Sequence, residues 1–175
     1  MNILKVFSTL EVLNIVAFIN QFTADADKTN SLPLKFKWNL SKNLKKLAPI
    51  AQEYEEFRNN ELSKLQKAWF DEEHSDEIMQ PKVDANGNPV LDESGAEETE
   101  KVRKIKDEFI DEYRRVVEEL NSKLNEIVSE QNEVDISCVD FDEFVENLPD
   151  DTNLTIEDLT MLSFMDTATN VKEAK

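Results

Sequence analysis

Two long stretches of the chain repeat apolar residues at the spacing of an α-helix. The first covers residues 40–70 and the second residues 100–128. In the second stretch the apolar positions recur every three or four residues, at Val102, Ile105, Phe109, Tyr113, Val116, Leu120, Leu124 and Ile127. Such spacing puts an apolar stripe on one face of a helix, and that stripe must be buried. We therefore predict that the two stretches are the arms of one antiparallel helical hairpin, whose buried residues include Leu47, Tyr54, Leu65, Phe109, Tyr113, Val116 and Leu120.

The segment between the two arms carries a turn signal. Asn86-Gly87 is flanked by Val83 on one side and by Val90 and Leu91 on the other, which predicts a β-hairpin with a type I′ turn. We expect residues 71–98 to form an acidic insert, or β-tongue, at the tip of the helical hairpin. Because this segment lacks apolar periodicity, shortening it to a brief linker should leave the fold intact.

The two ends of the chain predict a small mixed base. A strand over residues 3–8 leads into a helix over 9–22 and a polar loop over 24–31, and a strand beginning at Val134 can pair with the first strand. The sequence Thr155-Ile-Glu-Asp158 fits a capping box that opens a final helix. The predicted fold class is α+β, predominantly α: a long antiparallel helical hairpin with a small base of terminal strands and short helices. We expect one domain over residues 1–175, with a frayed tail at 167–175.

The charge of the chain is unevenly distributed. Residues 1–50 carry seven lysines and three acids, a net charge of +4, while residues 51–175 carry −22, for a total of −18. Fields of this size steer encounters between macromolecules and say little about fold. The sequence therefore indicates a protein that meets its partners through charge.

Few residues suit catalysis or metal binding. His74 is the only histidine and Cys138 the only cysteine, so a zinc site with three or four nitrogen or sulphur ligands has no basis, and an ordinary reducing compartment is indicated. We interpret His74 as a surface residue. Asp84, Asn86 and Asn88 match the start of an EF-hand loop, but Pro89 stands where glycine is required and Gly95 where glutamate is required.

Paired carboxylates are the remaining chemical candidates. They occur at Glu118-Glu119, Asp142-Glu143 and Asp150-Asp151, and a chain with 38 acidic residues contains such pairs by chance. No nucleophile, base or glycine-rich loop accompanies them. We expect a protein that is not an enzyme and has no cofactor.

Two charged surfaces are the candidate binding sites. Residues 130–175 hold 13 acids against only Lys172 and Lys175. Carboxylates on a folded scaffold can occupy the phosphate-binding groove of a basic partner, and we assign this role to Asp140, Asp142, Glu143 and Glu146. Acidic surfaces also confer solubility alone, and this reading stays open.

The alternative surface is a basic block with interleaved aromatics, made of Lys35, Lys37, Trp38, Lys42, Lys45 and Lys46. Lysines with exposed aromatics can bind single-stranded nucleic acid. The competing interpretation is structural: the aromatics pack under the helix start while the lysines extend into water or face an acidic helix. We favour the structural interpretation, because a net charge of −18 repels nucleic acid.

The N-terminal region contains an apolar stretch over residues 10–22 after Lys5. Glu11 and Asn14 interrupt it. A signal peptide needs an uninterrupted apolar run and a membrane span needs about 20 apolar residues. We expect a buried helix and no contact with a membrane.

The order of five segments along the chain carries a family resemblance. The segments are LPLKFKWNLSKNLKKL (32–47), YEEFRNNEL (54–62), DANGNPV (84–90), EVDISCVDF (133–141) and LTIEDLTMLSFM (154–165). In this order they resemble an uncharacterised family of short proteins encoded by tailed bacteriophages and prophages. The acidic insert around 71–100 departs from the family pattern. The resemblance implies a viral origin but carries no established activity, so no functional residue is transferred.

Together these features predict a non-enzymatic phage accessory protein in the host cytoplasm. It would bind a protein partner that is basic or binds nucleic acid itself, either a host factor or a phage replication or assembly component, and could act as an acidic inhibitor or mimic. The alternative is a structural subunit of the virion, associated with the head-tail region or the tail. In that case the helical hairpin would serve self-association.

Overall fold

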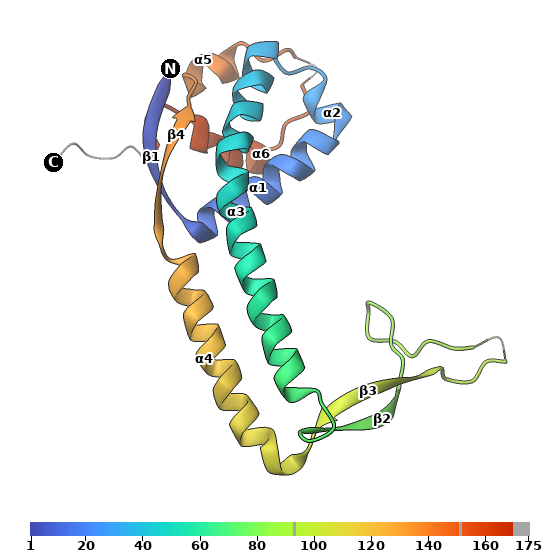
Figure 1. The fold of residues 1–175 in the computed structure, drawn as a ribbon. Coiled ribbons are helices and arrows are strands. Elements are labelled where there is room, and N and C mark those ends of the chain that lie inside the picture. Colours follow the sequence, from blue (N-terminus) through green and yellow to red (C-terminus); the bar gives the residue numbers. More distant parts are fainter. Residues whose placement is uncertain (93, 151, 170–175) are drawn as a thin grey trace. The chain divides into compact units, whose positions relative to one another are not determined.

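The computed structural model describes residues 1–92, 94–150 and 152–169 (Figure 1). The chain forms two compact units. The terminal unit comprises Met1–Phe57 together with Leu124–Lys175, and the central unit comprises Arg58–Lys123. The described residues form a mostly helical α+β fold with two two-stranded antiparallel sheets, which confirms the predicted class at this level.

The sheet of the terminal unit joins the N-terminal strand to a strand from the last third of the chain. Strand β1 (Asn2–Ser8) pairs with β4 (Gln131–Ser137), and the two run antiparallel side by side (Figure 1). Asn2 lies opposite Ser137 and Ser8 opposite Gln131. The predicted pairing of the two terminal strands is therefore confirmed.

Helix α1 (Thr9–Ala24) follows β1 directly. Ser8 and Glu11 form a capping box at its start. Its buried face has the spacing of an amphipathic helix and consists of Val12, Ile15, Ile19 and Phe22.

The polar loop predicted over residues 24–31 is partly wrong. A short helix, α2 (Ala26–Thr29), lies within it. The carboxylate of Asp25 accepts hydrogen bonds from the backbone N–H groups of Asp27 and Lys28, at 3.0 and 3.3 Å, and so caps the helix. A single capped turn is too short to show apolar periodicity, so the sequence pattern does not reveal it.

The long helix α3 (Leu34–Trp69) begins directly after Pro33. Its first half packs on α1 through Phe36, Leu40 and Leu47, which belong to the core of the terminal unit. Pro49 lies in the interior of the helix and has no backbone N–H to donate to the helical hydrogen-bond ladder.

The C-terminal segment adds three short helices to the terminal unit: α5 (Phe141–Glu146), α6 (Ile156–Leu162) and the 3-10 turn η2 (Ser163–Met165). The capping box of Thr155 and Asp158 is confirmed at the start of α6. Strand β4 ends at Ser137, Val139 forms an isolated parallel bridge to Asp166, and α5 begins at Phe141. Of the predicted frayed tail, residues 170–175 lie outside the described residues.

A lysine is buried in the terminal unit. Lys5 has no exposed surface, and its ammonium group donates hydrogen bonds to the backbone carbonyls of Phe164, at 2.9 Å, and Asp166. Burial lowers the pKa of Lys5, opposed by the nearby Cys138 and Asp166. The side chain therefore fastens the segment after α6 to strand β1.

The central unit corrects the predicted second arm. Residues 99–105 form strand β3 (Thr99–Ile105), which pairs antiparallel with β2 (Ser75–Pro81), and helix α4 (Ile110–Val128) starts only after the 3-10 turn η1 (Asp107–Phe109). Val102 and Ile105 fit a helical stripe by spacing. Both residues lie in a strand instead, because their segment pairs with β2. A short apolar pattern by itself does not distinguish a helix from a strand.

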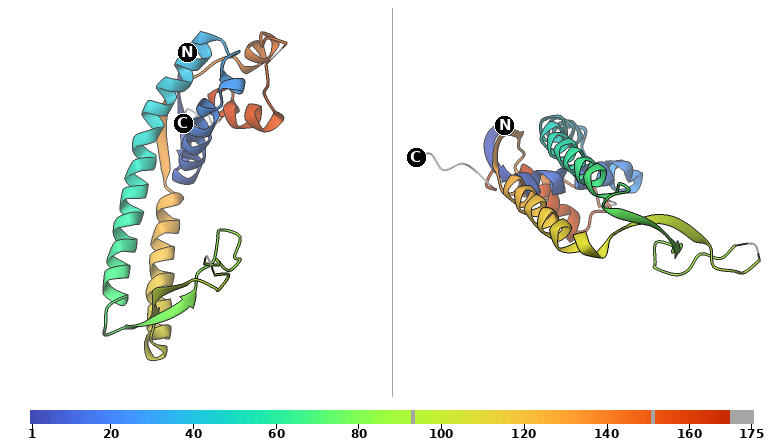
Figure 2. Two further views of the ribbon diagram at one scale, coloured as in Figure 1. Left: turned by 90° about the vertical axis from the view of Figure 1, so that its right-hand side faces the viewer. Right: turned by 60° about the horizontal axis from the view of Figure 1, so that its bottom comes forward.

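Two matched loops follow one another between β2 and β3 (Figure 2). In each loop, an aspartate carboxylate accepts hydrogen bonds from the backbone N–H groups two and four residues later in the chain. The backbone N–H of a glycine donates to the backbone carbonyl of the same aspartate. The loops start at Asp84 and Asp92 and contain Gly87 and Gly95, which have φ angles of +82° and +83°. The sequence shows no obvious repeat, but the structure contains one with a period of eight residues.

The turn predicted at Asn86-Gly87 is present, but its predicted type is wrong. Val83 and Pro89 are bridged across it. The closing bond runs from the N–H of Gly87 to the carbonyl of Asp84 at 3.0 Å, so Gly87 follows the turn and is not one of its two central residues. This is the pattern of a type I turn followed by a left-handed residue.

The two loops should be dispensable for folding. Replacing residues 82–98 with Asn-Gly between the paired residues Pro81 and Thr99 should preserve the unfolding midpoint of the protein, because the described side chains in this range are almost all exposed. The structure revises the prediction that all of residues 71–98 can be shortened to a linker. Deleting them should cause aggregation, because it removes β2 and the buried Ser75 and leaves β3 unpaired. Urea denaturation and circular dichroism of both deletions would check this. The prediction would be contradicted if the two deletion proteins had the same unfolding midpoint and the same solubility.

Candidate functional site

The structure places both predicted charged surfaces in the terminal unit. The acidic residues lie on α5 and at its N-cap, and the basic block lies on the first turns of α3. The rings of Phe36 in α3 and Phe144 in α5 stack with centroids 4.0 Å apart and an interplanar angle of 12°. Both rings are buried. Helix α5 is thereby anchored beside the start of α3 (Figure 1).

We call Asp140, Asp142, Glu143 and Glu146 the acidic face. Asp140 caps α5, since its carboxylate accepts the N–H of Glu143 at 3.0 Å. Residues 130–169 of the sequence contain no lysine or arginine. Among the described residues, no ion pair reaches the carboxylates of Asp142, Glu143 or Glu146, and all three are exposed. The acidic face thus presents its negative charge to solvent.

Part of the basic block has a structural role. The ammonium group of Lys46 lies 2.9 Å from the carboxylate of Asp135 and also donates to the backbone carbonyl of Asp135. These contacts tie α3 to β4. Lys37 donates to the carbonyl of Asn30 at 3.3 Å. Phe36 is buried, as the structural interpretation expected.

The expectation that both aromatics pack under the helix is wrong for Trp38. Its side chain is 57% exposed, and the ammonium group of Lys42 lies 5.4 Å from its ring centroid. Lys35 and Lys45 are also exposed. Spacings of three, four and three residues put four side chains on one face of α3. We call them the basic stripe: Lys35, Trp38, Lys42 and Lys45.

The two surfaces meet at one pocket of about 480 Å³. Lys35 lines it from the basic stripe, and Asp140 and Glu143 line it from the acidic face. Phe36 and Phe144 contribute aromatic surface. Periodicity could not bring these residues together, because about a hundred positions separate them in the sequence.

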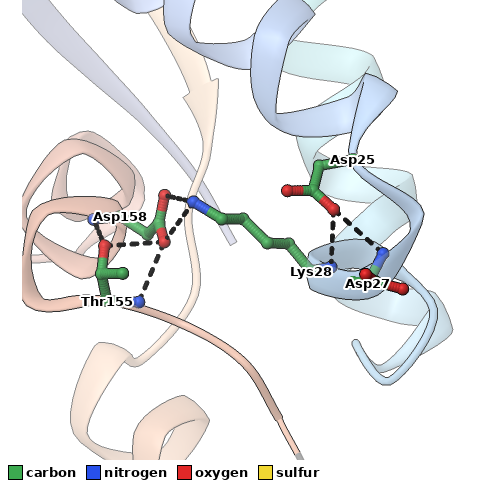
Figure 3. A network of polar contacts seen from close by, with 5 residues as sticks. All are labelled: Asp25, Asp27, Lys28, Thr155 and Asp158. Carbon is green, nitrogen blue, oxygen red and sulfur yellow. Dashed lines mark hydrogen bonds and ion pairs between the residues drawn. The ribbon is translucent and has the colours of Figure 1, made fainter.

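An ion pair that sequence reasoning missed joins α2 to α6. Both carboxylate oxygens of Asp158 lie 2.8 Å from the ammonium group of Lys28, and one of them also accepts from Thr155 (Figure 3). Burial alone would raise the pKa of Asp158, but the bonds from Lys28 and Thr155 outweigh it and lower the pKa below 3.8. The bond to Asp158 raises the pKa of Lys28. The sequence pattern predicted Asp158 as part of a capping box, but it did not predict the ion pair with Lys28, which lies 130 residues earlier in the chain.

This ion pair should make stability depend on acid. Because the pKa of Asp158 is lower in the folded state than in the unfolded state, its stabilisation is present above about pH 4 and is lost as the pH falls through the folded pKa. Asp158→Asn should therefore be less stable than the parent at pH 7, and the difference should shrink toward pH 2. Urea denaturation of both proteins across this range is the measurement. A difference independent of pH would contradict the assignment.

His74 is half-buried, which corrects its interpretation as a surface residue. Its ring lies 5.1 Å from the ring of Trp69 and 4.9 Å from that of Phe109, and Nδ1 is 2.8 Å from the carboxylate of Asp71. Hydrogen bonds from the backbone N–H of His74, from its ring and from the backbone N–H of Glu73 lower the pKa of Asp71. Ligand atoms of Asp71, Glu73 and His74 lie within 4.8 Å of one another. The same Asp71 oxygen already meets three nitrogen atoms, so the cluster is accounted for as a turn.

The other chemical candidates are scattered. Asp84 uses its carboxylate to order its own loop, which lowers its pKa. Glu118 and Glu119 are exposed on α4, and Asp150 is exposed, while Asp151 lies outside the described residues. Cys138 is buried, and burial raises the pKa of its thiol.

No helix in the described ranges has both the length and the apolar character needed to cross a membrane. Comparison of the chain with protein-family models, curated proteins and solved structures finds no match.

Proposed function

We propose that this chain is a non-enzymatic phage accessory protein that binds a basic protein partner through its acidic face. The partner is a host factor or a phage replication or assembly component, met in the host cytoplasm, and the carboxylates take the place of nucleic-acid phosphates. One observation carries the proposal: Asp140, Asp142, Glu143 and Glu146 lie on an anchored helix or at its N-cap, and among the described residues none of their carboxylates forms an ion pair with a lysine or arginine.

The anchoring of α5 matters for binding. A disordered acidic tail loses conformational entropy when it binds. Here Phe144 is buried against Phe36, and the Asp140 cap fixes the start of the helix. The carboxylates are therefore preorganised, which lowers the cost of association. The family resemblance to phage proteins supports the setting.

Association rates test the role of the acidic face. A pull-down from infected cells with mass spectrometry would identify the partner. Converting Asp140, Asp142, Glu143 and Glu146 together to Asn or Gln should then slow association and flatten its dependence on salt, because long-range charge acts mainly on the encounter rate. Asparagine also caps helices, so the variant keeps α5.

The matched control neutralises exposed carboxylates elsewhere. Converting four exposed residues of α4, Glu112, Glu118, Glu119 and Glu126, together to Gln removes the same number of charges, and it should leave both the rate and its salt dependence near those of the parent. Equal rates for the acidic-face variant and the parent in stopped-flow experiments would overturn the proposal. A defect confined to Lys42→Gln with Lys45→Gln would move the interface to the basic stripe.

A virion subunit is the second candidate, and it uses the helical hairpin. We infer that α3 and α4 form the two arms, because Tyr113 of α4 lies 5.6 Å from Trp69 and 6.0 Å from Phe70, measured between ring centroids. Of the residues predicted to be buried, Leu47 and Leu120 are buried, and the others are only half-buried: Tyr54, Leu65, Phe109, Tyr113 and Val116. The hairpin would then be an oligomerisation element. Detection of the protein in purified particles supports this role, whereas early expression and absence from particles supports the accessory protein.

A further inference from the structure

We propose that the terminal unit associates with a second copy of itself, with the basic stripe of each copy packed against the acidic face of the other. The inference shares the acidic face with the proposed function, so self-association would compete with binding of the basic partner. It is carried by the placement of two surfaces of opposite charge next to one another on the same unit.

The two surfaces are neighbours. Lys35 of the basic stripe and Asp140 and Glu143 of the acidic face line the same pocket. A two-fold axis can lie in the interface and run between these two surfaces. It then places the basic stripe of each copy opposite the acidic face of the other copy. The interface is isologous, so it closes as a dimer and does not extend into a filament.

The charges of these surfaces remain available to a partner. In the described part of the chain, no ion pair joins Lys35, Lys42 or Lys45 to the carboxylates of α5. Residues 28–52 contain no acid, and residues 130–169 contain no lysine or arginine. Each surface is thus uniform in sign, and a second copy supplies the opposite sign to both.

Apolar groups accompany both surfaces. Trp38 is 57% exposed within the basic stripe, and Leu34 beside it is 81% exposed. Val145 is 41% exposed on α5, between Asp142, Glu143 and Glu146. Exposed tryptophan with charged neighbours is typical of residues that dominate interface energies.

A second copy fits better than a nucleic acid. A polyanion would be attracted by the basic stripe but repelled by Asp140 and Glu143 beside Lys35, so it satisfies only one of the two surfaces. A second copy satisfies both. The repulsion between two chains of net charge −18 is screened beyond about 8 Å at physiological ionic strength, whereas charges in contact are screened much less.

Charge reversal tests this interface in the full chain. One variant carries Lys42→Glu and Lys45→Glu, and the other carries Glu143→Lys and Glu146→Lys. All four positions are exposed, and circular dichroism would verify that both variants fold. In sedimentation velocity at physiological salt, the parent should show a concentration-dependent dimer. Each variant alone should be monomeric at concentrations where the parent is dimeric.

An equimolar mixture of the two variants should restore the dimer, because each reversed surface then meets a reversed counterpart. The matched control, Glu118→Lys with Glu119→Lys, changes the net charge as much as the second variant but lies on α4, so it should remain dimeric. A parent that stays monomeric at the highest concentration would overturn the inference. So would variants that both dimerise alone, or a mixture that stays monomeric.

The same variants separate this inference from the proposed function. The Lys42→Glu, Lys45→Glu protein keeps the acidic face and should still bind the basic partner. Partner binding with a monomeric parent would overturn only self-association, whereas a restored dimer without partner binding would overturn only the proposed function. Binding of single-stranded DNA by a monomeric parent, lost in this variant, would assign the basic stripe to nucleic acid and overturn self-association.

Discussion

Replacing Asn43 with alanine is expected to lower the free energy of unfolding by about 2–6 kcal/mol, because each buried polar group left without a partner costs about 1–3 kcal/mol. The side chain of Asn43 is fully buried on α3. Its carbonyl oxygen accepts the N–H of Ser137 at 2.7 Å, and its amide nitrogen donates to the carbonyl of Ser137 at 3.1 Å. Alanine would leave both backbone groups at the end of β4 unsatisfied.

Urea denaturation of three variants would check this prediction. Asn60→Ala, at an exposed position of the same helix, should change the free energy of unfolding by no more than about 0.5 kcal/mol. Asn43→Asp keeps an acceptor for the N–H of Ser137 but loses the donor, and it adds a charge to a buried site. It should therefore also destabilise the protein strongly. A cost for Asn43→Ala no larger than that of the exposed control would show that these two hydrogen bonds do not hold α3 to β4.

Replacing Phe36 with alanine is expected to cost about 3–5 kcal/mol, the usual range for a buried phenylalanine. Phe36 is 2% exposed and stacks on Phe144, so its removal leaves a cavity under α5. The acidic face depends on that contact for its position. Partner binding should therefore weaken in this variant, even at temperatures where the rest of the protein remains folded.

Trp38 provides the control, two residues along the same helix. Its side chain is 57% exposed, so Trp38→Ala should cost much less stability than Phe36→Ala. Phe36→Leu should fall between them, because it keeps most of the buried apolar volume. Denaturation midpoints rank the three variants. A larger effect from Trp38→Ala would mean that the tryptophan, not the phenylalanine, packs against the body of the protein.

Features that depend on a few neighbouring residues were predictable from the sequence. Alternation predicted the two terminal strands, and their pairing is confirmed. The capping box of Thr155 and Asp158 is encoded in four consecutive residues and is confirmed as well. The apolar spacing of residues 9–22 and 40–69 correctly predicted helices in α1 and α3.

The start of helix α4 was not predictable in this way. Val102 and Ile105 fit the helical stripe that continues through α4, but they lie in β3. Their conformation is decided by hydrogen bonding to β2, more than twenty residues earlier in the chain. Local spacing contains no information about that partner.

The candidate site divides in the same way. The sign of its charges and the residues of the acidic face and basic stripe could be read from the sequence, because charge is a property of each residue. Their meeting at one pocket could not, since α3 and α5 are joined there by the stacking of Phe36 on Phe144. The burial of Lys5 and Asn43 likewise depends on backbone carbonyls and N–H groups supplied by distant segments. The sequence by itself thus determined the local elements and the charges, whereas packing between distant segments decided which side chains are buried and which surfaces adjoin.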